Sequence, residues 1–323
     1  MNLTETDRIT EPGFYRIPEP VYHADPCPAP SLSSSIARKL INDSPRHAWT
    51  DHPMLNPDWE PDEPSNRLEY GSACHRILLG KGSEIDVLPF KTYQSNAAKE
   101  ARAEAIDVGL TPIKEDSYHQ ALEMVEAFKA QINLFPDYVS TLFGAGTSEA
   151  VIAWQESGFW CRSMIDKLYI GDDRVVMFDY KTTEASASPY AVGKRLFDMG
   201  YDVQSAFYRR GLEALLGADR TFSSYIVSQE VKPPYAVSVV ELSHEAWQLA
   251  GKKVLAALAL WERCIKGDAW PSYPPIVATA TLPSWHEQMW LEREVNDDLL
   301  KSVDIAGFAK PLELPAKPIA GPC

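Results

Sequence analysis

The stretch from residue 161 to 182, CRSMIDKLYIGDDRVVMFDYKT, constrains the fold of this chain more than any other. Apolar and polar residues alternate on both sides of Gly171-Asp172-Asp173, and a turn between two alternating segments predicts a β-hairpin. Asp179 and Lys181 are two residues apart on the second segment, so they share one face of the strand. With the turn centred on Asp172-Asp173, Asp166 lies opposite Asp179, whereas a one-residue slip would turn Asp166 to the other face.

Two carboxylates that face each other across a hairpin repel unless a positive charge lies between them. A divalent metal ion fits that position, with Lys181 beside it as a cationic partner. Carboxylate oxygens would bind Mg²⁺, which polarises a phosphate and lowers the pKa of a bound water. Lys181 could then orient the water or stabilise the charge that develops on phosphorus. The alternative is an exposed hairpin with an ordinary Asp–Lys ion pair.

Four further residues are candidates for the same site. Glu149 opens the preceding strand and could add a carboxylate, or be a solvated strand end. His75 could bind a metal or a phosphate, or be an ordinary core histidine. Gln204 and Tyr208 are four residues apart on one helix and point the same way, so they could contact a phosphate, hold the lysine, or simply pack.

Basic residues occur in local pairs, of which Lys194-Arg195 and Arg209-Arg210 flank the candidate site in sequence. These pairs could follow a DNA backbone, although each is also typical of a solvated helix face. The net charge of −14 argues against a large basic surface, but a basic groove is compatible with it.

The predicted elements follow the order helices, three strands, helices, two strands and a helix. This order indicates an α/β or α+β fold, with a central mixed β-sheet flanked by helices and a helical N-terminal region. Proline content and weak periodicity predict an arm at residues 1–30 and a tail at 291–323, whose last 15 residues are mobile. Between them we expect a single domain, 31–290, with a helical region (31–145) and an α/β core (146–290).

The element boundaries follow from periodicity, caps and turn residues. We expect a serine-capped helix after residue 33, and helical segments at 66–80 and 95–133, the latter interrupted near Gly109–Pro112. The remaining predictions are strands at about 148–155, 159–170, 174–182, 223–230 and 235–242, and helices at about 189–197, 201–216, 243–266 and 282–295.

Several classes of protein are excluded. No run of 18 apolar residues is present, so we expect no membrane span. The first residues, MNLTETDRIT, lack the features of a signal peptide, so a cytoplasmic location is expected. The five cysteines include no CxxC pair, which argues against a disulfide framework and a zinc site.

The candidate residues occur in an order that resembles the PD-(D/E)xK nuclease superfamily, in the branch of RecB-type and lambda-type exonucleases. Three segments resemble those of the phage and prophage exodeoxyribonuclease VIII (RecE-like) family, and they extend the resemblance over about residues 20–290. These segments are YHADPCPAPSLSSSIARKLINDSP, GSACHRILLG and GDAWPSYPP.

The resemblance implies a restriction-endonuclease-like core in which Asp166 and Asp179 are metal ligands and Lys181 is the catalytic lysine. It also implies His75 as a further metal-site residue, and Glu149 is assigned beside these ligands. Gln204 and Tyr208 match the motif that follows the core in this family, and we add Lys194 and Arg209 as substrate contacts. The implied cofactor is Mg²⁺, for which Mn²⁺ can substitute.

The activity that the resemblance implies is digestion of linear double-stranded DNA from an end, in the 5′-to-3′ direction and without ATP. It would produce single strands for recombination, and it implies a ring-shaped homo-oligomer and a single-strand annealing protein as partner. Asp179 stands where the superfamily more often has Glu. A structure- or sequence-specific endonuclease on the same core, and a non-catalytic scaffold that binds DNA ends, stay open as alternatives.

Overall fold

A mixed sheet extends the predicted hairpin on both sides. The computed structural model describes residues 3–61, 66–80 and 82–303. The chain divides into two units, Met1–Tyr273 and Pro274–Cys323, and the main sheet belongs to the first. Within the described residues this sheet has eight strands, in the order β1-β2-β6-β7-β8-β9-β10 with β3 paired to β7.

The hairpin forms the middle of the sheet. β6 (Thr147–Glu156), β7 (Phe159–Ile170) and β8 (Arg174–Thr183) are antiparallel neighbours. The Gly171 N–H donates to the Arg174 carbonyl oxygen at 2.8 Å and closes the turn. The predicted hairpin and its turn are therefore confirmed.

A helical crossover leads from β8 to its parallel neighbour β9 (Thr221–Glu230). The crossover consists of α8 (Pro189–Asp198) and α9 (Tyr201–Leu216), and the Ser188 hydroxyl caps α8 by accepting the Ala191 N–H. β10 (Val237–Glu241) returns antiparallel to β9, so the sheet is mixed. Parallel neighbours require such a crossover because a tight turn can join only antiparallel strands.

The N-terminal segment, expected as an arm, contributes to this sheet. β1 (Thr4–Glu5) pairs with β2 (Gly13–Arg16), and β2 pairs with β6. α1 (Glu19–His23) and β3 (Ser31–Ser33) follow, and β3 pairs in parallel with β7. Strands of two to four residues are too short for sequence periodicity to reveal, so only the contacts with β6 and β7 define them.

A helical region lies between β3 and β6. It contains α2 (Ser34–Asn42), capped by Ser33 as predicted, and, as further helices, α3 (Pro45–Thr50), α4 (Asn66–Leu79), α5 (Asn96–Asp107), α6 (Glu115–Ile132) and α7 (Asp137–Ala145). The predicted interruption near Gly109 is present, and it holds a strand as well as a turn. That strand, β5 (Thr111–Lys114), pairs in parallel with β4 (Ile85–Leu88) to form a small second sheet.

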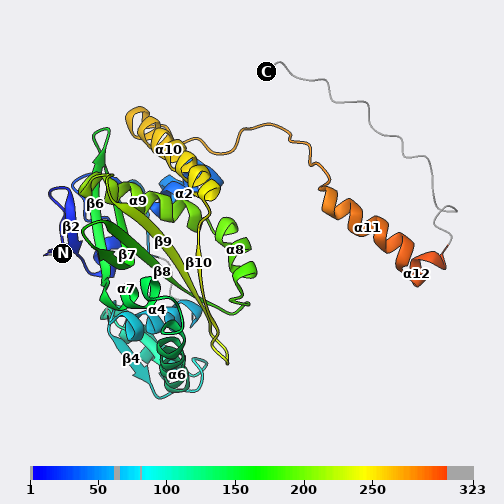
Figure 1. The fold of residues 1–323 in the computed structure, drawn as a ribbon, viewed down its shortest axis with the longest axis horizontal. Helices are drawn as coiled ribbons and strands as arrows, with labels where there is room; N and C mark the ends of the chain where they lie inside the picture. The colour runs from blue at the N-terminus through cyan, green and yellow to red at the C-terminus, as the bar shows by residue number, and fades with distance from the viewer. Residues whose placement is uncertain (1–2, 62–65, 81, 304–323) are drawn as a thin grey trace. The chain divides into compact units, whose positions relative to one another are not determined.

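The two faces of the central strands carry separate hydrophobic cores. Val175 and Met177 of β8 pack toward α2, α9 and α10 (His244–Gly267). Val176 and Phe178 point the other way, toward α4, α6 and α7. Figure 1 shows α9 and α10 on one side of these strands and α4 and α6 on the other. A mixed sheet flanked by helices confirms the predicted fold class.

The second unit contains α11 (Ser284–Asn296) and α12 (Asp298–Lys301). The predicted helix in LPSWHEQMWLEREV is thus present, while the predicted mobile residues at the C-terminus lie outside the described part of the chain. No helix among the described residues has the length and apolar character that a membrane crossing requires.

The contact of α9 with β6 generates a test of the fold. A Cβ at Gly211 would lie 2.6 Å from the Trp154 ring and 2.9 Å from the Ile152 side chain, both in the buried core. We therefore expect Gly211→Ala to lower the free energy of unfolding by about 1–3 kcal/mol, as overpacking does. Gly251 on α10 has nothing within 4 Å of the same position, so Gly251→Ala should raise stability by up to about 1 kcal/mol. Urea unfolding of both variants measures the difference, and equal effects would contradict the packing described.

Candidate active site

Asp179 and Lys181 lie at the carboxyl end of β8. Asp179 follows the buried side chains of that face, and only 5% of its surface is exposed. The Lys181 Nζ lies 2.8 Å from the Asp179 Oδ1. The ordinary alternative of an exposed hairpin therefore does not fit, because the ion pair forms around a buried carboxylate.

Asp166 reaches the same place from β7. The residue pairs of β7 and β8 end at Lys167 opposite Phe178, and the next pair in that register would be Asp166 opposite Asp179. Instead the Asp166 Oδ2 accepts the Tyr180 N–H at 2.8 Å. The carboxylate thus replaces a main-chain acceptor where the two strands separate, and it lies beside the residue that follows Asp179.

Glu149 occupies the corresponding position on β6. The pairs Ser148–Lys167 and Ala150–Ile165 lie on either side of it, so the register aligns Glu149 with Asp166, but the two do not pair. The backbone of Glu149 has a φ of +47°, which interrupts the regular strand. Three carboxylate residues therefore share one level across three neighbouring strands.

The side chain of Glu149 also approaches an acid that the sequence analysis missed. A Cβ at Gly82 would lie 3.4 Å from the Glu149 Oε1 and 3.8 Å from the Glu19 Oε2, so both carboxylates extend toward this glycine. A hydrogen bond with His23 lowers the pKa of Glu19, and a charge on His75 acts in the same direction. Glu19 lies three residues before the Tyr22-His23 pair, and that proximity was the only sequence signal for it.

Burial and charge act against each other at Asp179. Burial raises the pKa of its carboxyl; the Lys181 ammonium lowers that pKa, and the Asp166 carboxylate raises it further. For Lys181, burial alone would lower the pKa, but the two carboxylates outweigh it and the net shift is upward. The lysine is thus charged at neutral pH.

Two residues of α9 hold one oxygen of Asp179 in place. The Gln204 Nε2 lies 2.9 Å from the Asp179 Oδ1 and 2.7 Å from the Tyr208 hydroxyl. The predicted alignment of Gln204 with Tyr208 is therefore present, and Gln204 contacts the aspartate rather than the lysine. The Asp179 Oδ2 is buried without a hydrogen-bond partner among the described residues.

His75 reaches the end of β8 from α4. At Gly71, one turn earlier, this helix contacts the end of β8, since a Cβ there would lie 3.5 Å from the Thr182 Oγ1, an ordinary van der Waals distance. The His75 ring lies 5.0 Å from the Tyr180 ring, measured between centroids. Across the described ranges, no three His, Cys, Asp or Glu side chains converge on one point as a preformed metal cage. Direct ligation by His75 or Glu149 stays a prediction.

The residues present nevertheless fit a magnesium ion. Mg²⁺ keeps several of its waters and is usually bound through one or two carboxylates together with substrate phosphates, so it needs no complete protein cage. Asp179 offers a buried oxygen to which no described residue donates, and Asp166 supplies a second carboxylate whose repulsion a cation would relieve.

The two predicted substrate contacts are Arg209 on α9 and Lys194 on α8. Arg209 forms an ion pair with Glu213 at 2.7 Å, and its guanidinium lies 5.6 Å from the Phe222 ring centroid and 5.4 Å from that of Trp247. Lys194 is exposed on α8. Contacts of these two residues with DNA stay predictions.

Comparisons with known proteins bear on the family and the fold of this chain. The model of a family described as a PDDEXK-like domain of unknown function (DUF3799) matches residues 33–278, more than half of the chain. The crystal structure of a "putative exonuclease" from Eubacterium rectale is 14% identical, with a TM-score of 0.51 over 83% of this chain and 93% of that chain. At this identity the likeness supports a shared fold alone. The crystal structure of SSO0001 is 13% identical over 55% of this chain and 72% of that chain, and its TM-score of 0.27 is too low to bear on the fold. No curated protein matches.

The partnerless oxygen of Asp179 predicts that a divalent cation stabilises the folded protein. A ligand at 100 times its dissociation constant adds about 2.7 kcal/mol, so millimolar Mg²⁺ should raise the melting temperature by a few degrees over EDTA. Asp179→Asn should abolish this shift, while Asp137→Asn, at an exposed position on α7, should retain it. Differential scanning calorimetry measures both variants. An unchanged shift in Asp179→Asn would exclude this carboxylate as a ligand.

Proposed function

This chain belongs to the family of PDDEXK-like domains DUF3799, and on that premise we propose that it is a metal-dependent nuclease, a hydrolase that cleaves phosphodiester bonds of DNA. One observation carries the proposal. The Asp179 carboxylate is buried, and Lys181 and Gln204 hold one of its oxygens while the other has no partner within the described residues. A buried oxygen that lacks a hydrogen-bond partner lowers the stability of the folded protein unless a ligand binds to it.

Asp166 and Asp179 would hold the cation, with His75 and Glu149 as the further residues of the site. A bound Mg²⁺, or Mn²⁺ in its place, supplies polarisation of the phosphate and a lower pKa for water. Gln204 and Tyr208 position Asp179 from α9, so that its free oxygen has one fixed direction.

Lys181 would act on the substrate through its charge. The neighbouring carboxylates keep its ammonium protonated, so it serves as an electrostatic group rather than as a general base at neutral pH. An ammonium beside the scissile phosphate stabilises the negative charge that grows on the phosphoryl oxygens. Its Nζ also lies 5.3 Å from the Tyr201 ring centroid, which restricts where the lysine can move.

Within the nucleases, we favour an exonuclease that digests linear double-stranded DNA from an end in the 5′-to-3′ direction and leaves single strands for recombination. The order of motifs from Tyr22-His23 to the Trp-Pro segment supports this choice. The description of the Eubacterium rectale protein agrees with it, but at 14% identity that likeness adds support for the fold alone.

The partners that belong to this proposal are DNA ends, further copies of the chain in a ring, and a single-strand annealing protein. A ring would keep the DNA in a channel during progressive digestion. Lys194 and Arg209 are the proposed contacts with the DNA backbone, and a cytoplasmic location is compatible with these partners.

Removal of the lysine or of the buried carboxylate tests the mechanism. We expect Lys181→Met and Asp179→Ala each to lower the rate of Mg²⁺-dependent nucleotide release by at least about a hundredfold, since the first removes charge stabilisation and the second a metal ligand. Lys129→Met is the matched control, because Lys129 is an exposed lysine on α6 paired with Glu126. Release of acid-soluble nucleotides measures the rate, and circular dichroism checks folding. Full activity in either site variant would remove the proposed mechanism.

Substrate form separates the exonuclease from its alternatives. Linear duplex DNA labelled at one 5′ or one 3′ end should lose the 5′ label first in Mg²⁺ and keep both labels in EDTA. Covalently closed circular duplex should stay intact, because it offers no end. Nicking of the circle would indicate an endonuclease, and DNA binding without any cleavage would indicate a scaffold.

A further inference from the structure

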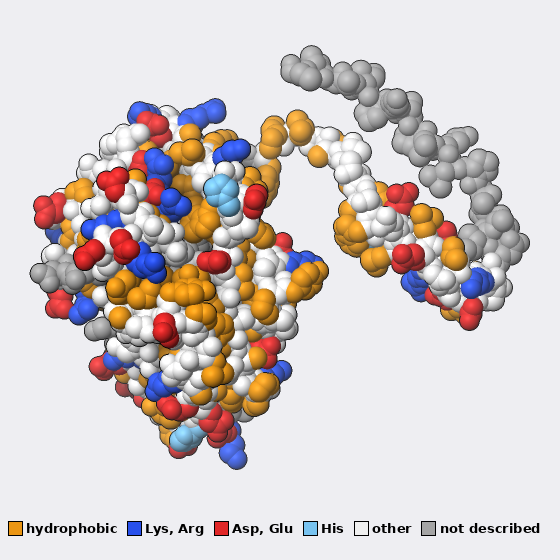
Figure 2. Space-filling model, in the orientation of Figure 1, with side chains coloured by type: hydrophobic (Ala, Val, Ile, Leu, Met, Phe, Trp, Pro, Cys, Tyr) orange, Lys and Arg blue, Asp and Glu red, His pale blue; other side chains and the backbone are white. Residues whose placement is uncertain are grey.

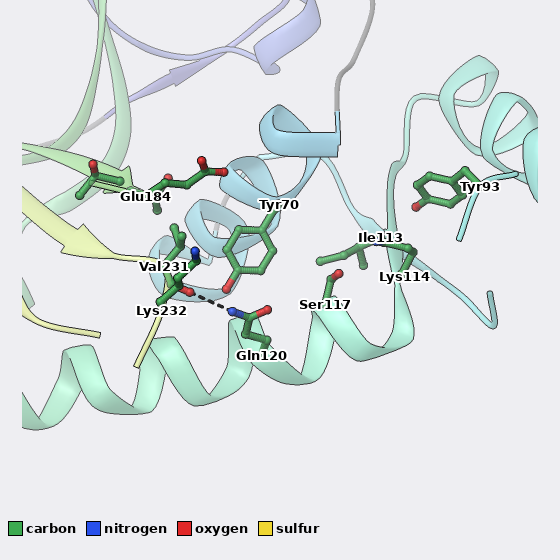
Figure 3. Close-up of a pocket in the computed structure, with 11 residues that line it drawn as sticks. Tyr70, Tyr93, Ile113, Lys114, Ser117, Gln120, Glu184, Val231 and Lys232 are labelled. Atoms are coloured by element: carbon green, nitrogen blue, oxygen red, sulfur yellow. Dashed lines mark hydrogen bonds between the residues drawn. The ribbon is translucent and has the colours of Figure 1, made fainter. Parts of the chain in front are cut away.

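A cavity of about 440 Å³ opens at the carboxyl end of β8, next to the candidate active site. Thr182, the residue after Lys181, forms part of its wall, together with Thr183 and Glu184. The opposite wall comes from α4, β5 and α6 (Figure 3). Cavities of about 300–1,000 Å³ have the size that small ligands occupy in proteins.

The wall combines aromatic faces with hydrogen-bonding groups. Tyr70 projects from α4 between the strand ends and α6, and Tyr93 lies farther along, beyond Lys114 (Figure 3). Ser117 and Gln120 face the cavity from α6, and the Gln120 amide also donates to the Val231 carbonyl oxygen at 2.9 Å. Aromatic rings with adjacent amides and hydroxyls are the groups that proteins use to hold an unpaired base.

Positive charge gathers around this cavity. Among the described residues that line it, Lys114 and Lys232 are basic and Glu184 is acidic. The Arg102 guanidinium and the Lys114 ammonium lie 5.6 Å and 6.0 Å from the Tyr93 ring centroid. The chain as a whole has a net charge of −14, and acidic and basic side chains intermingle on the face of the larger unit in Figure 2. The excess of cations is therefore local, and it would attract a phosphodiester backbone.

The cavity and the active site share the same two elements. Tyr70 precedes Gly71, the residue at which α4 comes close to Thr182, and His75 on the same helix contacts Tyr180. β8 in turn carries Lys181 and, two residues later on the same face, the cavity residue Thr183. Since α4 and β8 pack directly together, the cavity keeps a fixed place relative to Asp179 and Lys181.

We propose that this cavity accepts one unpaired nucleotide of the DNA strand that is being cleaved, a role that rests on the proposed nuclease function. The base stacks on Tyr93, and Lys114 and Lys232 neutralise the adjoining phosphates. A duplex must therefore lose at least one base pair beside the scissile bond, and the energy of stacking in the cavity offsets part of that loss.

Substrates that lack a single base test this role. A tetrahydrofuran residue, which keeps the sugar and phosphate but removes the base, is placed in turn at each of the first several positions of a labelled duplex end. Binding is measured by fluorescence anisotropy with Ca²⁺ in place of Mg²⁺, and cleavage is measured with Mg²⁺. At one position, loss of the base should weaken wild-type binding by about 5- to 150-fold, the range that base–aromatic stacking produces.

Two variants connect that effect to the cavity. In Tyr93→Ala, the ratio of the binding affinities for base-containing and abasic DNA should fall to near one. The affinity of this variant for abasic DNA should equal that of the wild type. Lys114→Gln should weaken binding of both DNAs equally. It should also reduce the slope of log binding constant against log salt concentration by the amount expected for about one lost phosphate contact. Tyr138→Ala is the matched control, because this tyrosine on α7 is 52% exposed outside the cavity. Thermal unfolding confirms that each variant is folded.

The outcomes separate this inference from the proposed activity. If the wild type cleaves DNA but no position responds to loss of its base, or if Tyr93→Ala keeps the full ratio, the nucleotide role of the cavity is wrong and the nuclease function stands. If binding shows the base effect and Tyr93→Ala removes it, but Mg²⁺ supports no cleavage, the cavity role stands and the nuclease function fails.

Discussion

The carboxylate of Asp179, buried at the end of a strand, is the constraint on which the arrangement of this site depends. An ionised carboxylate is costly to remove from water unless charges and hydrogen bonds compensate it. Here Lys181 and Gln204 compensate one oxygen, and α9 and β8 must meet at a fixed distance to bring them there. The second oxygen has no partner within the described residues, which costs free energy. A cation bound there would offset that cost.

The separation of β7 from β8 gives that carboxylate its neighbours. Had the ladder continued past Phe178, main-chain groups would have paired and Asp166 would have lain directly opposite Asp179. The Asp166 carboxylate instead accepts the Tyr180 N–H. This backbone donor therefore keeps a hydrogen-bond partner at the point where β7 and β8 separate. α4 approaches the end of β8 through Gly71.

The proposed nucleotide cavity extends this picture beyond the reacting group. A phosphodiester substrate needs both a site for the scissile phosphate and a place for the base attached to it. The net charge of −14 argues against a broad basic surface on this chain, so a few cations near the end of β8 carry more of the attraction. Lys114 and Lys232 stand there, next to two tyrosine rings.

Local patterns in the amino-acid sequence predict the hairpin around Gly171, its register, the crossover helices, and the shared face of Asp179 and Lys181. These features follow from alternation, caps and turn residues, which act over a few neighbouring positions. Long-range packing, in contrast, brings β2 into the sheet, Glu19 toward Glu149, and Gln204 onto the aspartate rather than the lysine. The cavity likewise joins Tyr70, Tyr93, α6 and β8, segments far apart in the chain. Such contacts depend on how whole elements pack, and no local pattern encodes them.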